Sequence, residues 1–303
     1  MKILNKLINK LFFILKLIKN VDRNLDQIKI NQGSILAQLT KGGLIEDSNF
    51  KVFSKFGEDG IIQFLINNIN IKNKTFIEFG VEDYTESNTR FLLMHNFWQG
   101  FIIDGGKRNV DKIKNYYFYG LYNLQASCNF VTKENINEVL NNSKYDYDLG
   151  LLSIDIDGND YHVLEAINQY KPRILICEFN NLFELQNITV PYKPNFNRFY
   201  EHYSGNYQGA SLKAINFLAE KKGYCLVAID KSGTNAFFVR KNLLNNKVKK
   251  IDVNNSYFRY GIKYNFNKKG KLILSHDFNE RRNSIIGMNV LNLETNKVEK
   301  FKK

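Results

Sequence analysis

Two apolar segments in the middle of the chain, LGLLSIDID and RILICEF, end in side chains that could hold a cation. The first ends in Asp155 and Asp157, and the second brings Glu178 and, just after it, Asn180. Carboxylates that lie close together after buried strands are costly to ionise unless a cation pairs with them. Asp155 is therefore expected to face a positively charged ligand. Asp157, Glu178 and Asn180 are candidate Mg²⁺ ligands, because Mg²⁺ prefers oxygen donors. The alternative is that the two aspartates only cap the helix that follows them.

A second group of polar residues follows two earlier apolar segments. TFIEFG ends in Glu78 and Gly80, and GFIIDG ends near Asp104, which lies 24 residues after Gly80. In nucleoside-binding folds an acidic residue reaches the ribose hydroxyls from that distance. The turn after Gly80 is poor in glycine, which fits a cofactor without a pyrophosphate, such as S-adenosylmethionine, better than NAD. The candidate cofactor-binding residues are Glu78, Gly80, Glu82, Ser87, Asn88, Asp104 and Asp155.

Short apolar runs that alternate with helical stretches must position these residues. Seven runs are expected to be strands: 75–80, 100–105, a weaker one within 121–131, 149–157, 173–179, 224–230 and 235–241. The first six alternate with helices, which predicts parallel crossovers. The last two are separated only by KSGT, and a connection that short makes an antiparallel hairpin. The expected fold is α/β, a Rossmann-like sheet of seven strands with flanking helices in which the last strand is antiparallel, as in class I methyltransferases.

The two ends of the chain differ from this central domain, which is expected at 46–245. Residues 1–45 place leucine, isoleucine and valine at a helical spacing and interrupt them with lysines, which predicts an amphipathic helix too short and too charged to span a membrane. It could dock on an anionic membrane surface, form a coiled coil in a homo-oligomer, or pack on the protein's own core. Residues 246–303 form a basic extension with a hairpin at 267–270 and then a polar end, in which no chemistry is evident.

The charge distribution argues against a nucleic-acid partner. The chain carries a formal net charge of +13, but residues 1–45 contribute +6 and residues 241–303 contribute +10, so that residues 46–240 carry −3. A nucleic-acid substrate needs cations beside its phosphates. Three cysteines far apart, and no cleavable leader, predict a reduced cytoplasmic protein, with peripheral contact at the inner face of a membrane through the amino-terminal helix.

Five segments together resemble the FkbM-like S-adenosylmethionine-dependent methyltransferases over roughly residues 50–240. They are FSKFGEDGII, FIEFGVEDYTESNTRFLL, FIIDGG, LLSIDIDGNDYHVLEAI and YQGASLKAINFLAEKKGYCLVAI. The resemblance implies O-methylation of a sugar hydroxyl, often in surface polysaccharides or glycosylated metabolites. It also implies a further glycine after the GVED turn, where this chain has Tyr84.

Methyl transfer to a hydroxyl needs an in-line approach and a group that removes or weakens the hydroxyl proton. Asp157 or His162 could act as the general base, or the Mg²⁺ ligands named above could acidify the hydroxyl. The aromatic insertion at 181–208 is expected to cover the site and contact the sugar acceptor. Two other interpretations stay open: DID at 155–157 is a DxD sequence typical of metal-dependent glycosyltransferases, and the chain could be a catalytically degenerate scaffold.

Overall fold

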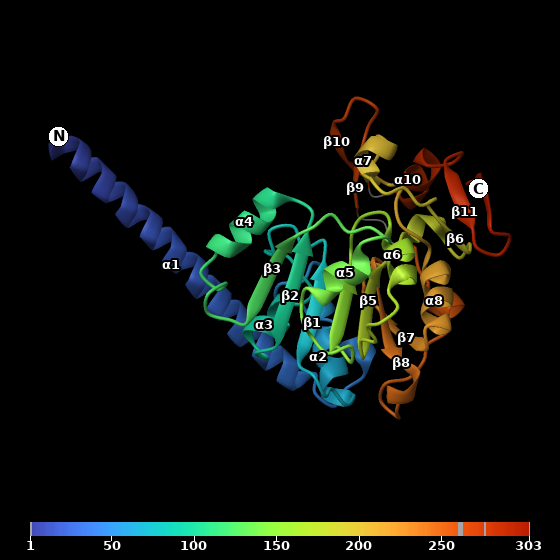
Figure 1. The fold of residues 1–303 in the computed structure, drawn as a ribbon, viewed down its shortest axis with the longest axis horizontal. Coiled ribbons are helices and arrows are strands. Elements are labelled where there is room, and N and C mark those ends of the chain that lie inside the picture. The colour runs from blue at the N-terminus through green and yellow to red at the C-terminus, as the bar shows by residue number, and fades with distance from the viewer. Residues whose placement is uncertain (1, 260–262, 276, 303) are drawn as a thin grey trace.

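The computed structural model describes residues 2–259, 263–275 and 277–302, and a seven-stranded sheet lies at its centre (Figure 1). The strands are β1 (Thr75–Phe79), β2 (Gln99–Asp104), β3 (Leu124–Cys128), β4 (Leu151–Ile154), β5 (Ile174–Glu178), β7 (Tyr224–Ile229) and β8 (Asn235–Arg240). Their order is β3-β2-β1-β4-β5-β8-β7. β1 to β5 pair in parallel, whereas β8 is antiparallel to both neighbours. The predicted α/β fold and its antiparallel hairpin are confirmed.

Helices cover both faces of the sheet because the strands alternate apolar side chains to either side. The connecting helices are α2 (Glu58–Asn68), α3 (Arg90–Met94), α4 (Lys107–Asn115), α5 (Ile136–Asn141), α6 (Asp160–Ala166) and α8 (Leu212–Lys221), with a short 3₁₀ helix η1 (Ile45–Asp47) before them. One face buries Phe76 of β1 and Ile102 of β2 with α2, and the other buries Ile77 and Phe238 with α8. This core fixes the carboxyl ends of β1, β2, β4 and β5 side by side.

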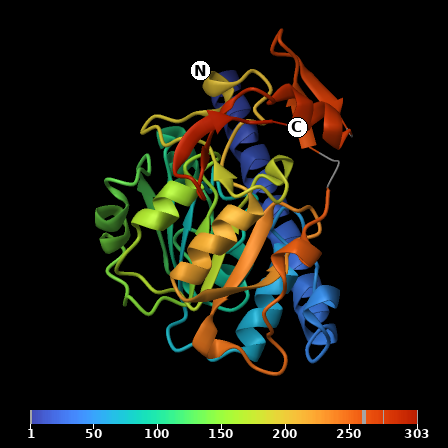
Figure 2. The same cartoon turned by 90° about the vertical axis from the view of Figure 1, so that its right-hand side faces the viewer.

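The amino-terminal helix α1 (Lys2–Leu39) has two halves with different surroundings. Its first half extends beyond the body, as Figure 1 shows, whereas in Figure 2 the helix runs behind the body; residues 4–25 are exposed. Its second half packs on the protein's own core through Ile30, Gly33 and Ala37. Asp26 marks the boundary, where its carboxylate pairs with buried Arg90 at 2.5 Å. Packing on the core therefore holds for the second half alone. Among the residues that the structure describes, no helix combines the length and apolarity needed to cross a membrane.

The insertion after β5 and the carboxyl-terminal extension fold together. The insertion contains η2 (Asn181–Phe183), β6 (Ile188–Thr189) and α7 (Arg198–Glu201), and the extension contains η3 (Lys241–Leu243), α9 (Val253–Ser256), β9 (Lys263–Phe266), β10 (Leu272–Ser275), α10 (Phe278–Ser284), β11 (Asn289–Asn292) and β12 (Lys297–Lys300). β9 and β10 form the predicted hairpin. The expectation of a merely polar end after it is wrong. β11 pairs with β6 as well as β12, and Phe183 and Val190 of the insertion share a third core with Ile285, Val290 and Phe301.

Candidate active site

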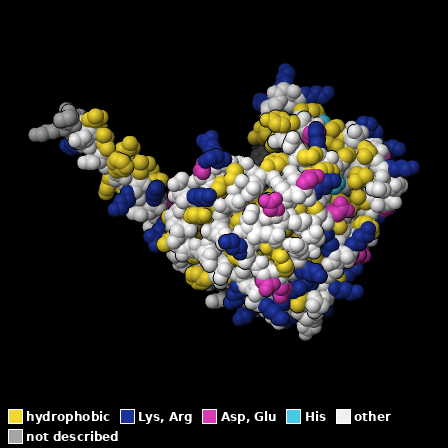
Figure 3. Space-filling model, in the orientation of Figure 1, with side chains coloured by type: hydrophobic (Ala, Val, Ile, Leu, Met, Phe, Trp, Pro, Cys, Tyr) yellow, Lys and Arg dark blue, Asp and Glu magenta, His cyan; other side chains and the backbone are white. Residues whose placement is uncertain are grey.

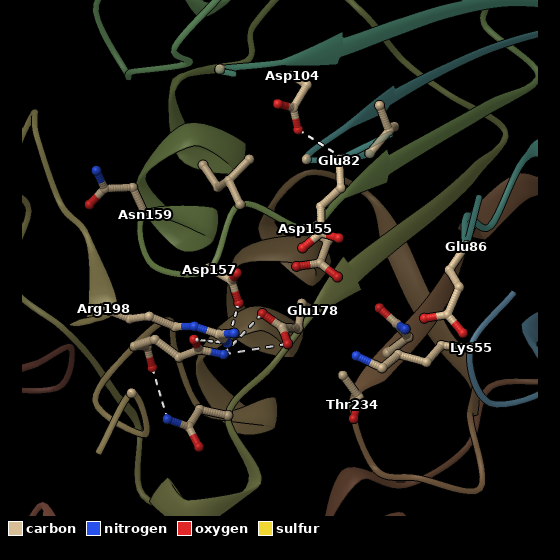
Figure 4. Close-up of a pocket in the computed structure, with 18 of the residues that line it drawn as sticks. Lys55, Glu82, Glu86, Asp104, Asp155, Asp157, Asn159, Glu178, Arg198 and Thr234 are labelled. Carbon is tan, nitrogen blue, oxygen red and sulfur yellow. Dashed lines mark hydrogen bonds and ion pairs between the residues drawn. The ribbon is translucent and has the colours of Figure 1, made fainter. Parts of the chain in front are cut away.

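A cavity of about 770 Å³ lies at the carboxyl ends of β1, β2, β4 and β5 (Figure 4). Open parallel sheets bind ligands at this edge. One wall, which we call the strand-end side, consists of the loops that follow these four strands. The opposite wall, which we call the insertion side, consists of residues 181–208 and the extension 246–302. Lining residues from the insertion side include Phe196, Arg198, Phe199, Gln208, Phe266 and Arg281.

Ten of the eleven residues selected from the sequence line this cavity. They are Glu78, Gly80, Glu82, Ser87, Asn88, Asp104, Asp155, Asp157, Glu178 and Asn180. His162 is the exception. It is buried one turn into α6, and its Nε2 lies 2.8 Å from the carbonyl oxygen of Val190. Burial lowers its pKa. The structure does not bring His162 to the site, so its geometry gives no support to the expected general base there.

Gly80 serves a different purpose from the one expected. We expected it to let a ligand approach the backbone. Its φ is +71°, and a Cβ built on it would lie 1.5 Å from the carbonyl oxygen of Asp155. The glycine is therefore required because the loops after β1 and β4 pass so close to each other that no side chain fits.

Glu78 holds the loop between β1 and α3. Its carboxylate accepts hydrogen bonds from the backbone N–H of Asn88 at 2.9 Å, from that of Thr89 at 3.2 Å, and from the Thr89 hydroxyl. Burial raises the pKa of Glu78 to about 7, although these bonds oppose the rise. The loop's amides, which in dinucleotide-binding folds would face a pyrophosphate, are thus occupied by the protein's own carboxylate.

Asp104 lies at the end of β2, where it faces the cavity beside Glu82 (Figure 4). Its Oδ2 accepts the backbone N–H of Glu82 at 2.8 Å. Its Oδ1 accepts the backbone N–H of Gly106 at 2.7 Å and the Asn109 amide at 3.0 Å. A carboxylate has about four acceptor positions, so Oδ2 keeps one for a ligand. Asp104 can bind a ribose hydroxyl, although its own loop takes most of its hydrogen-bonding capacity.

Tyr84 stays out of the cavity. Its φ of 63° is a conformation that glycine adopts readily, which fits the glycine expected at this position. Its side chain is fully buried, its hydroxyl lies 2.9 Å from that of Thr89, and its ring packs edge-on against Phe118. Burial raises its pKa well above the ordinary range. The departure at Tyr84 therefore fills the core beneath the loop and leaves the cavity open.

Three carboxylates gather at the centre of the cavity. Asp155, Asp157 and Glu178 each place an oxygen within 4.8 Å of the others. Asn180, an expected metal ligand, does not join them. Its Nδ2 donates to the carbonyl oxygens of Asn206 and Gln208, both at 2.9 Å, and its Oδ1 accepts the N–H of Leu182. Asn180 instead ties the insertion to the end of β5, and Asp155 completes the acidic group.

Arg198 is a site residue that the sequence analysis missed. Its Nη1 lies 2.6 Å from Asp157 Oδ1 and 2.8 Å from Gln208 Oε1, and Gln208 Nε2 lies 3.2 Å from Glu178 (Figure 4). Arg198 therefore supplies positive charge to the carboxylate group from the insertion side. The signal was present, since Arg198 is the sole arginine within the aromatic insertion, but it did not indicate which carboxylate it would meet.

Asp160 is a second residue near the site that the sequence analysis did not select. It is buried, and its two oxygens accept the backbone N–H groups of Ile156 and Gly158, both at 2.9 Å. Burial, and then the charge of Glu178, raise the pKa of Asp160 to about 7. Asp160 thus bonds the loop amides that Asp155 and Asp157 were alternatively expected to cap, which leaves those two side chains directed at the cavity.

Three side-chain amides around the cavity retain unused polar atoms. Within the described part of the chain, Asn159 Oδ1, Asn181 Nδ2 and Asn235 Oδ1 are buried and have no hydrogen-bond partner. An unsatisfied buried polar atom costs about 1–3 kcal/mol. These atoms lie within the wall, beneath the surface of the cavity, so they mark polar groups behind its lining.

The likeness of this chain to known proteins is limited to the fold. No protein-family model and no curated protein matches the sequence, so membership of the FkbM-like group stays a prediction. Among solved structures, an S-adenosylmethionine-dependent methyltransferase from Clostridium acetobutylicum is 11% identical, with a TM-score of 0.40 over 60% of this chain and 90% of that one. An O-methyltransferase from Bacillus cereus in complex with SAH is 12% identical, with a TM-score of 0.38 over 72% and 95%. At these identities and TM-scores, the role of the cavity has to be inferred from this chain's own residues.

Proposed function

We propose that the protein is an S-adenosylmethionine-dependent O-methyltransferase that acts on a sugar hydroxyl. The observation that carries the proposal is one cavity that joins Asp104, at the end of β2, to the carboxylates of Asp155, Asp157 and Glu178. Asp104 could accept the hydroxyl groups of a ribose, and the three carboxylates could offset the charge of a positively charged centre. A sulfonium nucleoside presents both groups.

The strand-end side favours this cofactor over a dinucleotide. A pyrophosphate needs free backbone N–H groups at a helix amino terminus. Here the N–H groups of Asn88 and Thr89 already donate to Glu78. A nucleoside without phosphates does not need free N–H groups at this position.

The insertion side favours a sugar acceptor. Phe199 packs edge-on against Phe266 at 5.4 Å between ring centres, and both rings line the cavity. These rings match the apolar faces of a sugar, and the polar side chains of Arg198 and Gln208, which also line the cavity, can bond its hydroxyl groups.

Bound adenosylmethionine supplies an electrophilic methyl group on a positively charged sulfur. Asp155 and Glu178 would offset that charge, and Asp157 would accept the proton that the acceptor hydroxyl loses. The acceptor oxygen would bond to the methyl carbon as the carbon–sulfur bond breaks, and neutral adenosylhomocysteine would be the leaving group. Arg198 holds the Asp157 carboxylate in place. The insertion side excludes water and orients the acceptor in line with the methyl group.

The same three carboxylates, Asp155, Asp157 and Glu178, also fit a hard divalent cation, and bound Mg²⁺ would acidify the acceptor hydroxyl. Arg198 already neutralises part of their charge, which makes a metal less necessary. Activity that survives EDTA supports Asp157 as the base, and activity that is lost with EDTA and restored by Mg²⁺ supports a metal.

Thermal denaturation with candidate ligands tests the proposal. Adenosylhomocysteine at about a hundred times its dissociation constant should stabilise the protein by about 2.7 kcal/mol. NAD, and a UDP-sugar with Mn²⁺, should leave the melting temperature unchanged. Stabilisation by the UDP-sugar alone would favour the DxD glycosyltransferase interpretation. Stabilisation by none of them would favour the degenerate scaffold.

A further inference from the structure

The projecting half of α1 exposes a large apolar face. Leu4, Ile8, Leu11, Leu15 and Ile18 share one side of the helix, and each is between 41% and 61% exposed. Phe12 and Ile14, 67% and 43% exposed, widen this surface on its two flanks, whereas Phe13 lies on the opposite face of the helix. A patch of this kind marks a surface that binds something.

The charge of the same segment indicates which kind of partner its apolar face binds. Residues 2–21 contain five lysines and neither aspartate nor glutamate. A second copy of α1 would bring these like charges together along a coiled coil, which disfavours self-association. An anionic surface with an apolar interior complements both the lysines and the leucines.

A second basic projection lies on the same side of the molecule, at a distance from the amino end of α1. The turn of the β9–β10 hairpin carries exposed Lys268, Lys269 and Lys271. Both ribbon views place this hairpin and the amino end of α1 on the upper side of the molecule, although they lie far apart along its length in Figure 1 (Figures 1 and 2), and the space-filling view shows lysine and arginine side chains at the tip of the hairpin (Figure 3).

The cavity opens between these two projections. On one side, Lys19 of α1 lines a surface groove with Lys107, Arg108 and Lys112 of α4, the helix that follows Asp104. On the other side, Phe266 of β9 lines the cavity itself. The groove also contains Asp111, which pairs with Lys107, and it shares no lining residue with the cavity, so of the two projections it is the hairpin that reaches the cavity lining.

We propose that this side of the molecule docks on an anionic lipid bilayer, with the first half of α1 lying in the interface and the hairpin lysines on the headgroups. Docking does not depend on the reaction. Its consequence, that the acceptor is presented from the membrane surface, rests on the proposed function.

Co-sedimentation of the full chain with vesicles tests the proposal. The protein should bind phosphatidylcholine vesicles that contain phosphatidylglycerol, should leave pure phosphatidylcholine vesicles unbound, and should be released by salt. Leu11→Glu with Ile18→Glu should abolish binding. Lys268→Glu with Lys269→Glu should weaken it at least about 25-fold, because each lysine near such a surface is worth about fivefold. Lys72→Glu with Lys74→Glu, at the opposite end of the sheet, is the matched control and should bind like the wild type.

The altered side chains are exposed, so circular dichroism and the melting temperature of each variant should match the wild type. Absence of binding to anionic vesicles, or equal binding by the Leu11 and Ile18 variant, overturns the proposal. A wild-type dimer in analytical ultracentrifugation that this variant dissociates would assign the apolar face to a second copy instead. Vesicle binding without any response to adenosylhomocysteine would reject the methyltransferase and keep the docking surface.

Discussion

The two walls of the cavity are held by different kinds of contact. On the strand-end side, Asp160 accepts N–H groups from Ile156 and Gly158, within four residues of itself along the chain. On the insertion side, Leu291 of β11 pairs with Thr189 of β6, about a hundred residues earlier. The first wall is fixed by local backbone geometry, whereas the second depends on packing between distant segments.

This difference suits the proposed reaction. A cofactor that many enzymes share needs a binding site of fixed geometry. The binding site for a particular acceptor must be able to change without disturbing the cofactor site. The insertion side can vary because its core, around Phe183 and Phe301, is separate from the two cores of the sheet. We therefore predict that a substitution in one wall can impair the function of that wall without affecting the other.

The largest expected effect comes from the third core. Phe301→Ala should destabilise the insertion side by about 3–5 kcal/mol, because a buried aromatic ring packed on Phe183 is removed. Urea denaturation measures the loss, and Val298→Ala, at an exposed position on β12, is the control. Adenosylhomocysteine affinity should persist while acceptor methylation falls. A parallel loss of both would show that the walls are not independent.

A change at the junction of the walls should affect turnover. Asp157→Asn keeps the shape of the side chain but removes its charge, so the rate should fall at least about 100-fold with cofactor affinity nearly unchanged. Single-turnover kinetics and calorimetry separate the two quantities. Asp111→Asn, on the exposed surface of α4, should have no effect. Wild-type turnover in the Asp157 variant would remove this residue from the chemistry.

A change confined to the strand-end side should affect cofactor binding. Asp104→Ala removes a charge-assisted bond to a ribose hydroxyl, worth about 1.5–3 kcal/mol, so affinity for adenosylhomocysteine should fall about tenfold to a hundredfold. It also frees the N–H groups of Glu82 and Gly106, so a melting curve should accompany the calorimetry. Unchanged affinity would exclude Asp104 from the cofactor site.

The smallest effect is a pH dependence that belongs to the strand-end side. The pKa values of Glu78 and Asp160 are each raised to about 7, mainly by burial. Between their ordinary values and about 7, the folded state binds more protons than the unfolded state, so stability rises as the pH falls. Through these two groups, lowering the pH from about 7.5 to about 6.5 should add about 1 kcal/mol to the free energy of unfolding. Burial also raises the pKa of Asp230 to about 7, which adds to the slope, and lowers the pKa values of His95, His162 and His202, which opposes it. Phe301→Ala should keep this slope, and an unchanged slope in Glu78→Gln would contradict the assignment.

The sequence predicted the strand-end side well because its signals are local. Glu78, Asp104 and Asp155 stand directly at strand ends, where periodicity and turn residues locate them. The insertion side could not be predicted in the same way. The sequence around Arg281 and Phe266 does not indicate that these residues line the cavity. They reach it because the extension packs on the insertion, where β11 pairs with β6. The hydrogen bonds of Asn180 and His162 could not be predicted for a related reason, since their partners, Asn206 and Val190, lie in the irregular insertion.

The β6–β11 pairing also sets an order of events during synthesis. β6 leaves the ribosome about a hundred residues before β11, which a ribosome adding about 5–20 residues per second takes about 5–20 s to make. Once β7 and β8 have followed, about fifty residues after β6, the sheet can form and carry its carboxylates, but the insertion still has no partner for its edge or for Phe183. A nascent chain therefore passes through a stage with one wall complete and the other bare, and chaperones that bind exposed apolar segments would find the insertion during that stage.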